Sequence, residues 1–76
     1  DKKDEALSTM EYAVSIKENY LQARNELARM YFLKGDLEKA KTQYSYSLQN
    51  IAPEDELIKE KLKIVEASMG AQIKKR

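Results

Sequence analysis

The chain has 76 residues, so we expect at most one small domain. It contains no cysteine and no histidine, which excludes a disulfide framework, a thiolate metal site and the commonest general base. Fourteen basic and 13 acidic residues leave a net charge of +1, which argues against bulk electrostatic binding of nucleic acid. No apolar run approaches the roughly 20 residues that cross a bilayer, so no direct membrane insertion is expected. Glu, Lys, Leu and Ala dominate, as in helical proteins.

The first helix is predicted from about Lys3 to Lys17. Asp4 and Glu5, near its start, suit the positive end of a helix dipole. Apolar residues recur at three- and four-residue steps and predict one buried stripe. This stripe consists of Ala6, Leu7, Met10, Ala13 and Val14.

The second helix is predicted from about Tyr20 to Lys34. Its expected buried residues are Leu27, Ala28, Met30 and Tyr31. Gly35 follows directly and is expected to cap this helix in the left-handed conformation, which costs least for glycine. Asp36 is then expected to begin the third helix, with its side chain bonding the free backbone amides.

The third helix is predicted to end before Pro53, and its apolar face comprises Leu37, Ala40, Tyr44, Ser47, Leu48 and Ile51. We expect Tyr44 in the core and Tyr46 on another face, partly exposed. The fourth helix is predicted to start at Pro53, because proline is favoured at the first helical position, and to end by Gly70. Its predicted stripe is Ile58, Leu62, Val65 and Met69. A frayed basic tail is expected to follow.

The stretch from Asn25 to Tyr44 places small residues at two fixed points with bulky residues beside them. It reads L-A-x2-Y from Leu27, then Gly35-Asp36, then A-x3-Y from Ala40. This resembles the tetratricopeptide repeat, whose 34-residue unit follows W-x2-L-G-x2-Y, then A-x3-F, then P. An echo at the same offset of 34 residues pairs Ala6 with Ala40, Met10 with Tyr44, Ala13 with Ser47 and Val14 with Leu48. The chain departs from the motif at Arg24, where the motif has Trp, and at Ser47, where it has Ala.

The resemblance implies an all-α fold, with about four helices in antiparallel hairpins stacked as a short right-handed α-solenoid. Residues 1–19 would be the second helix of a partial repeat, 20–53 a complete repeat, 54–70 a capping helix and 71–76 a basic tail. Lys63 and Glu66 occupy the places of Ala28 and Tyr31, as expected for the polar outer face that ends an array. The first helix lacks its own partner, so we expect the chain to be a piece of a longer protein.

In this family the ligand lies in a concave groove lined mainly by the first helix of each repeat. Position by position, the resemblance implies a groove formed by Gln22, Asn25, Arg29, Phe32, Leu33, Leu57, Glu60 and Ile64, with Ala67 and Ser68 continuing the last row. Asn25 and Arg29 would clamp a peptide, or Arg29 would pair with Asn25 or Glu26 on a solvated face. Leu57 and Ile64 would anchor a partner, or the bundle itself would bury them.

The resemblance therefore implies a protein–protein interaction scaffold that binds a peptide or helix of another protein. We expect no enzyme, no cofactor and no metal site, because the acidic residues are dispersed and no Gly-rich phosphate loop is present. One alternative is a homodimerisation module. Another is the soluble C-terminal tail of a larger protein; bacterial envelope polysaccharide polymerases look similar in ending with such repeats after their membrane spans. The absence of cysteine is compatible with either side of a membrane.

Overall fold

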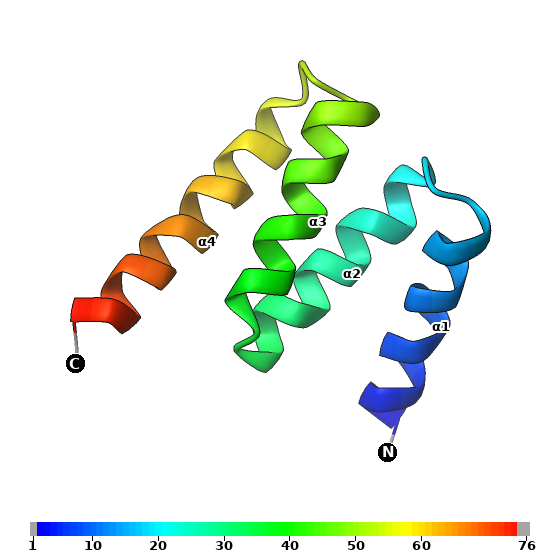
Figure 1. Ribbon diagram of the computed structural model, residues 1–76, viewed down its shortest axis with the longest axis horizontal. Coiled ribbons are helices and arrows are strands. Elements are labelled where there is room, and N and C mark those ends of the chain that lie inside the picture. Colours follow the sequence, from blue (N-terminus) through cyan, green and yellow to red (C-terminus); the bar gives the residue numbers. More distant parts are fainter. Residues whose placement is uncertain (1, 75–76) are drawn as a thin grey trace.

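The computed structural model describes residues 2–74, and the side chains of residues 2–71. This range contains four α-helices and no strand, which confirms the all-α prediction (Figure 1). The helices are α1 (Lys2–Ile16), α2 (Leu21–Lys34), α3 (Leu37–Asn50) and α4 (Glu56–Lys74).

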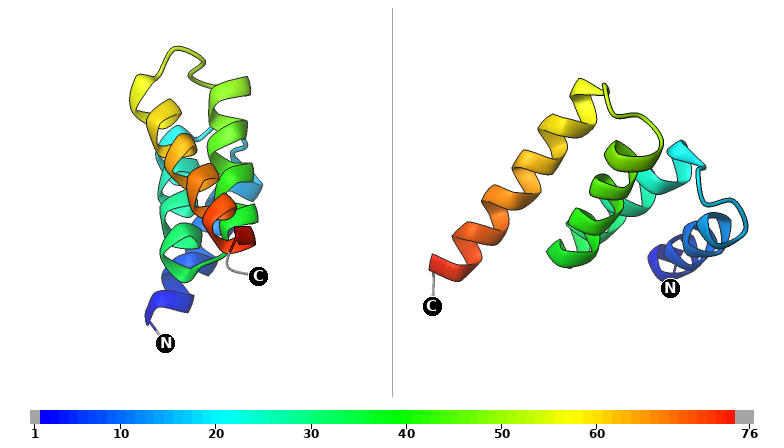
Figure 2. Two further views of the ribbon diagram at one scale, coloured as in Figure 1. Left: turned by 90° about the vertical axis from the view of Figure 1, so that its left-hand side faces the viewer. Right: turned by 45° about the horizontal axis from the view of Figure 1, so that its top comes forward.

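Each helix packs against the next one in the sequence, so the chain forms a row of antiparallel helices. The α2–α3 hairpin lies in the middle, with α1 on one side and α4 on the other (Figures 1 and 2). The molecule measures 38 × 35 × 15 Å, so it is thin in one direction. Because the row does not close on itself, every helix keeps at least one face away from its neighbours.

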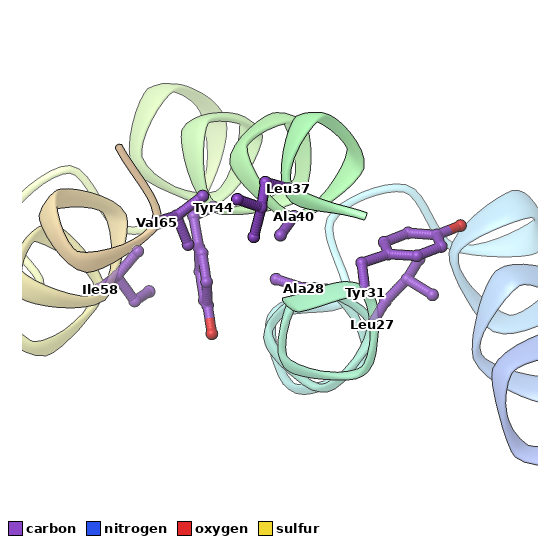
Figure 3. Packing of buried hydrophobic residues seen from close by; sticks show 8 residues of the cluster. All are labelled: Leu27, Ala28, Tyr31, Leu37, Ala40, Tyr44, Ile58 and Val65. Atoms are coloured by element: carbon purple, nitrogen blue, oxygen red, sulfur yellow. The ribbon is translucent and has the colours of Figure 1, made fainter. Parts of the chain in front are cut away.

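The centre of the hairpin is a contact between two alanines. Ala28 of α2 and Ala40 of α3 point toward each other and are both fully buried (Figure 3). With only a methyl group on each side, the two backbones can approach more closely than helices that meet through larger side chains. The predicted pair of small residues is therefore confirmed.

Two tyrosines lie on opposite sides of this centre, one beside α4 and one toward α1 (Figure 3). Tyr44 of α3 lies beside Ile58 and Val65 of α4, and all three side chains are buried. Tyr31 of α2 points toward α1, where its hydroxyl donates a hydrogen bond of 2.5 Å to the carboxylate of Glu11. One aromatic side chain on each side of the hairpin thus helps to attach the flanking helix.

The first helix has the predicted stripe but no fully buried residue. Ala6, Leu7, Met10, Ala13 and Val14 are half-buried, and every other described side chain of α1 is exposed. Only one side of α1 is covered, by α2. This helix is therefore the most weakly packed of the four.

Arg24, at the position where the repeat motif has tryptophan, fastens the α1–α2 loop to α3. Its guanidinium lies 3.7 Å from the centre of the Tyr46 ring, and Nη1 donates to the Gln43 side chain at 2.9 Å. Its Nε donates to the carbonyl oxygen of Glu18 at 3.0 Å. Tyr46 is partly exposed, as predicted, and its hydroxyl donates to Asn19 at 3.1 Å. Stacking and hydrogen bonds of this one side chain therefore hold the loop against α3.

In the turn between α2 and α3, the predicted cap at Gly35 is present, and the predicted capping bond of Asp36 is not. Gly35 caps α2 with a φ of 86°, and its N–H donates to the carbonyl of Phe32. Asp36 precedes α3, but its side chain bonds no backbone amide of that helix, so the predicted capping bond is wrong. Its carboxylate lies 3.8 Å from the ammonium of Lys39 instead.

Both predicted ends of the fourth helix are wrong. Pro53 lies in a turn, and α4 begins at Glu56 because Asp55 caps it: the Asp55 carboxylate accepts a hydrogen bond of 3.1 Å from the Ile58 amide. Gly70 does not end the helix, since its φ is not positive and α4 continues to Lys74. Most of the predicted basic tail is therefore helical, and Lys75 and Arg76 lie outside the described residues.

The charged residues predicted to keep the outer side of α4 uncovered are both exposed. Lys63 lies on the solvent side. Glu66 lies 3.6 Å from Lys41 of α3, so it also joins the two helices at the surface.

Enlarging one member of the alanine pair should separate α2 from α3. We expect Ala40→Leu to lower the free energy of unfolding by about 1–3 kcal/mol, because the added carbons meet a filled interface. The same change at Ala67, which is exposed on α4, should stay within about 0.5 kcal/mol of the wild type. Urea unfolding followed by circular dichroism measures both; equal effects would contradict the close contact.

Alkaline pH should weaken the attachment of α1. Burial, first, and the hydrogen bond with Glu11, second, raise the pKa of Tyr31 above its ordinary value. The folded protein thus holds this proton more tightly than the unfolded chain, whose tyrosines titrate near ~10. The stabilisation is complete below that pH and is lost as the pH rises above it.

We therefore expect the stability difference between the wild type and Tyr31→Phe to shrink from about pH 9 to about pH 11. The lysines titrate in the same range, but they are common to both proteins and cancel in the difference. Urea unfolding at each pH is the measurement. A difference that stays constant would show that Tyr31 ionises equally in both states.

Candidate binding groove

A groove runs between α2 and α4, with Tyr44 of α3 at its floor, and we call it the α2–α4 groove. It consists of two adjoining hollows that share Arg29, Tyr44 and Lys61. The larger hollow has a volume of about 540 Å³, and its walls include Gln22, Asn25, Glu26, Leu57 and Ile58. The smaller hollow has a volume of about 120 Å³ and is completed by Phe32, Ile64 and Val65.

Six of the eight predicted groove residues line the α2–α4 groove: Gln22, Asn25, Arg29, Phe32, Leu57 and Ile64. The other two lie elsewhere. Leu33 borders a different hollow, between α1 and α2, because it is one residue, or about 100°, further around the helix than Phe32. Glu60 borders a hollow on the α3 side of α4. Ala67 and Ser68, which were to continue the row, line neither part of the groove.

Lys61 and Glu26 are groove residues that the sequence did not reveal. In α4, the groove row runs from Leu57 to Lys61 to Ile64, whereas the predicted row took Glu60. Side chains three, four and seven residues apart all lie on one side of a helix. A step of three residues falls about 60° short of a full turn, and a step of four residues passes it by about 40°. The helical period therefore allows either residue, and the sense in which α4 packs on α3 selects Lys61.

Two large apolar side chains of the groove are open to solvent. Leu57 is 62% exposed and Ile64 is 51% exposed, so the packing of the bundle does not bury them. Their immediate neighbours in the sequence, Ile58 and Val65, are 2% and 1% exposed and fill the core. The alternative that the bundle buries Leu57 and Ile64 is therefore wrong.

Arg29 pairs with Glu26 one turn earlier on α2. Its Nη2 bonds one carboxylate oxygen, and its Nε donates to the other at 3.3 Å. This hydrogen bond, more than the charge itself, holds the pKa of Glu26 below its usual range. Both side chains are well exposed, so such a pair adds little to stability and can rearrange.

Asn25 does not pair with Arg29. Its side-chain oxygen accepts a hydrogen bond of 3.3 Å from the Ser47 hydroxyl, which is fully buried. Of the two pairings considered from the sequence, only that of Arg29 with Glu26 is present. A clamp made by Asn25 and Arg29 together is not preformed.

Tyr44 is a core residue, as predicted, but its hydroxyl belongs to the groove. The ring is 3% exposed, and the hydroxyl makes no hydrogen bond within residues 2–71. No described side chain leaves a buried oxygen unpaired, so this oxygen must reach solvent. Figure 3 shows it pointing away from α3, between α2 and α4. The groove floor therefore offers one free phenolic donor and acceptor, whose pKa is raised by burial.

Within residues 2–74, no cluster of three or more acidic side chains is placed to hold a metal ion. None of the helices in the same range is long and apolar enough to cross a membrane. Comparisons with protein-family models, with curated proteins and with solved structures give no significant match. The chemistry of the groove must therefore be read from its own residues.

Removing the two tyrosine hydroxyls should have different consequences. Tyr44→Phe should change the free energy of unfolding by less than about 0.5 kcal/mol, because its hydroxyl has no partner within the protein. Tyr31→Phe at neutral pH should lower it by about 1–2 kcal/mol, since a hydrogen bond to a carboxylate is lost. Urea unfolding of both variants at pH 7 tests this. A large loss for Tyr44→Phe would show that its hydroxyl bonds within the fold.

Proposed function

We propose that this chain is a protein–protein interaction scaffold that binds a peptide or helix of another protein in the α2–α4 groove. The observation that carries the proposal is the exposure of Leu57 and Ile64. They lie seven residues apart on one helix, each in one of the two hollows of the groove. Apolar side chains arranged in this way can anchor two side chains of one bound segment.

The polar groups of the groove suit the orientation of a peptide. Gln22 and the Tyr44 hydroxyl can form hydrogen bonds with the amide groups of a peptide. Arg29 and Glu26 can break their ion pair and bind charged side chains of the peptide instead. These groups are carried by helices, so little order has to be created in the scaffold on binding. The entropic cost of binding then falls mainly on the ligand.

The repeat pattern supports the same function. Met10 and Tyr44 are 34 residues apart; Met10 of α1 packs against the buried core, and Tyr44 of α3 faces α4 (Figure 3). We propose that the helices form a short right-handed α-solenoid of tetratricopeptide type, ending with α4 as a capping helix. In such an array the α2–α4 groove is the concave face. No catalytic role is proposed, because the groove brings together no nucleophile with a general base.

Self-association is the second candidate, and it is favoured by a different surface. Tyr12 and Ile16 are 66% and 68% exposed and lie one turn apart on α1. A second copy of the chain could cover them. A melting temperature that rises with protein concentration would favour this candidate over the monomeric scaffold.

Peptides selected from an unbiased display library against the whole chain should bind in the α2–α4 groove. We expect Leu57→Glu and Ile64→Glu each to weaken the selected peptides at least tenfold, or about 1.4 kcal/mol, because a carboxylate replaces an apolar anchor. Fluorescence anisotropy with labelled peptides measures the affinities.

Leu33→Glu is the matched control, since Leu33 is 69% exposed but lies outside the groove. Peptides that bind in the groove should keep affinities for Leu33→Glu within about twofold of the wild type. All three side chains are exposed, so the variants should fold, which circular dichroism checks. Selected peptides that bind Leu57→Glu and Ile64→Glu as well as the wild type would contradict the proposal, as would a failure to select any peptide.

A further inference from the structure

A second hollow lies on the other side of α2, between the first half of α1 and the end of α2, and we call it the α1–α2 hollow. It has a volume of about 550 Å³. Leu7, Met30 and Leu33 form its apolar part, and Leu33 is 69% exposed. The α2–α4 groove shares only Arg29 with it. It is therefore a separate surface from the groove of the proposed function.

The internal repeat shows what shape of ligand this side of α1 can accept. Lys3 and Ala6 of α1 correspond, at the offset of 34 residues, to Leu37 and Ala40 of α3. Leu37 and Ala40 are 7% and 0% exposed, because α2 lies over that face of α3. Lys3 is exposed and Ala6 is half-buried. A helix placed on α1 as α2 is placed on α3 would cover them.

The charges around the hollow show what chemistry that helix would need. Four basic side chains line it, namely Lys2, Lys3, Arg29 and Lys34, against one acidic side chain, Asp4. Lys34 lies 3.5 Å from Asp4, and Arg29 pairs with Glu26. Neither Lys2 nor Lys3 forms an ion pair with a carboxylate of the described residues.

The substitution inside the repeat leads to the same conclusion. Lys3 takes the place that Leu37 has in α3, so the covering helix should present a carboxylate there rather than an apolar side chain. We propose that the α1–α2 hollow binds an amphipathic helix of a partner protein that is acidic on both sides of its apolar stripe. Its apolar residues pack on Leu7, Met30 and Leu33, and its carboxylates pair with Lys2, Lys3 and Lys34.

The test uses the whole chain and a synthetic probe. The probe is a fluorescein-labelled helical peptide of about 18 residues. Leucines spaced at i, i+3, i+4 and i+7 form its apolar stripe, glutamates lie on both sides of that stripe, and alanines fill the remaining positions. A second peptide has lysine in place of every glutamate. Fluorescence anisotropy at about 50 mM salt measures binding, since higher salt would screen the exposed charges.

We expect the acidic probe to bind and the lysine peptide to bind at least tenfold more weakly. Leu33→Glu and the double variant Lys2→Glu, Lys3→Glu should each weaken the acidic probe at least tenfold. Two matched controls should stay within about twofold of the wild type: Leu57→Glu for the apolar change and Lys63→Glu for the charge change. Circular dichroism confirms that each variant is folded.

Several results would overturn the proposal. The proposal is contradicted if the acidic probe does not bind at about 1 mM, or if the lysine peptide binds equally well. Equal losses for Leu57→Glu and Leu33→Glu would place the probe in the α2–α4 groove or in no defined site. A chain that is dimeric by itself, and that Leu33→Glu makes monomeric, would show that a second copy occupies the hollow.

Discussion

The contact between Ala28 and Ala40 is the constraint on which the other features depend. Because both side chains are single methyl groups and fully buried, α2 and α3 can lie close together along their length. The larger residues of these helices then lie beside the contact rather than within it. Tyr44 is directed toward α4, where it meets Ile58 and Val65, and Tyr31 is directed toward α1 (Figure 3). The spacing of the outer helices, and with it the α2–α4 groove, follows from this central packing.

Most of the fold could be predicted from local signals in the sequence. The stripe of α1, the alanine pair and the cap at Gly35 each depend on a few neighbouring residues with strong preferences. The ends of α4 could not be predicted in the same way. Pro53 and Gly70 are common at helix ends, but the capping bond of Asp55 starts the helix later, and nothing in the described structure requires a left-handed residue at Gly70. Where two residues could each begin or end a helix, the three-dimensional packing decides between them.

The candidate groove shows the same limit at the level of single residues. The family resemblance led to six residues that do line the groove, because they lie on the central sides of α2 and α4. It missed Lys61 and included Glu60 and Leu33, which are one position away on the helical surface. Residue spacing gives the face of a helix to within about 100°, the angle between neighbouring residues, and only the packing of α4 on α3 gives the rest. The role of the Tyr44 hydroxyl could not be inferred either, since its ring fits the core.

The helix α2 contributes to both proposed binding surfaces. Its residues form one wall of the α2–α4 groove and one wall of the α1–α2 hollow, and Arg29 borders both. The two surfaces differ in charge, since the groove lining has both signs and the hollow lining is mainly basic. A scaffold of this size can thus present two chemically different surfaces because its helices form an open row. A closed bundle of four helices would bury both.

The proposed function requires that the α2–α4 groove is open to a ligand in a folded single chain. Sedimentation equilibrium over a hundredfold range of protein concentration, with circular dichroism on the same samples, tests this most directly. We expect the mass of one chain and constant helicity throughout the range. A dimer that dissociates on dilution and loses helicity as it does so, and that Leu57→Glu makes monomeric, would contradict the proposed function, because the groove would then serve self-association.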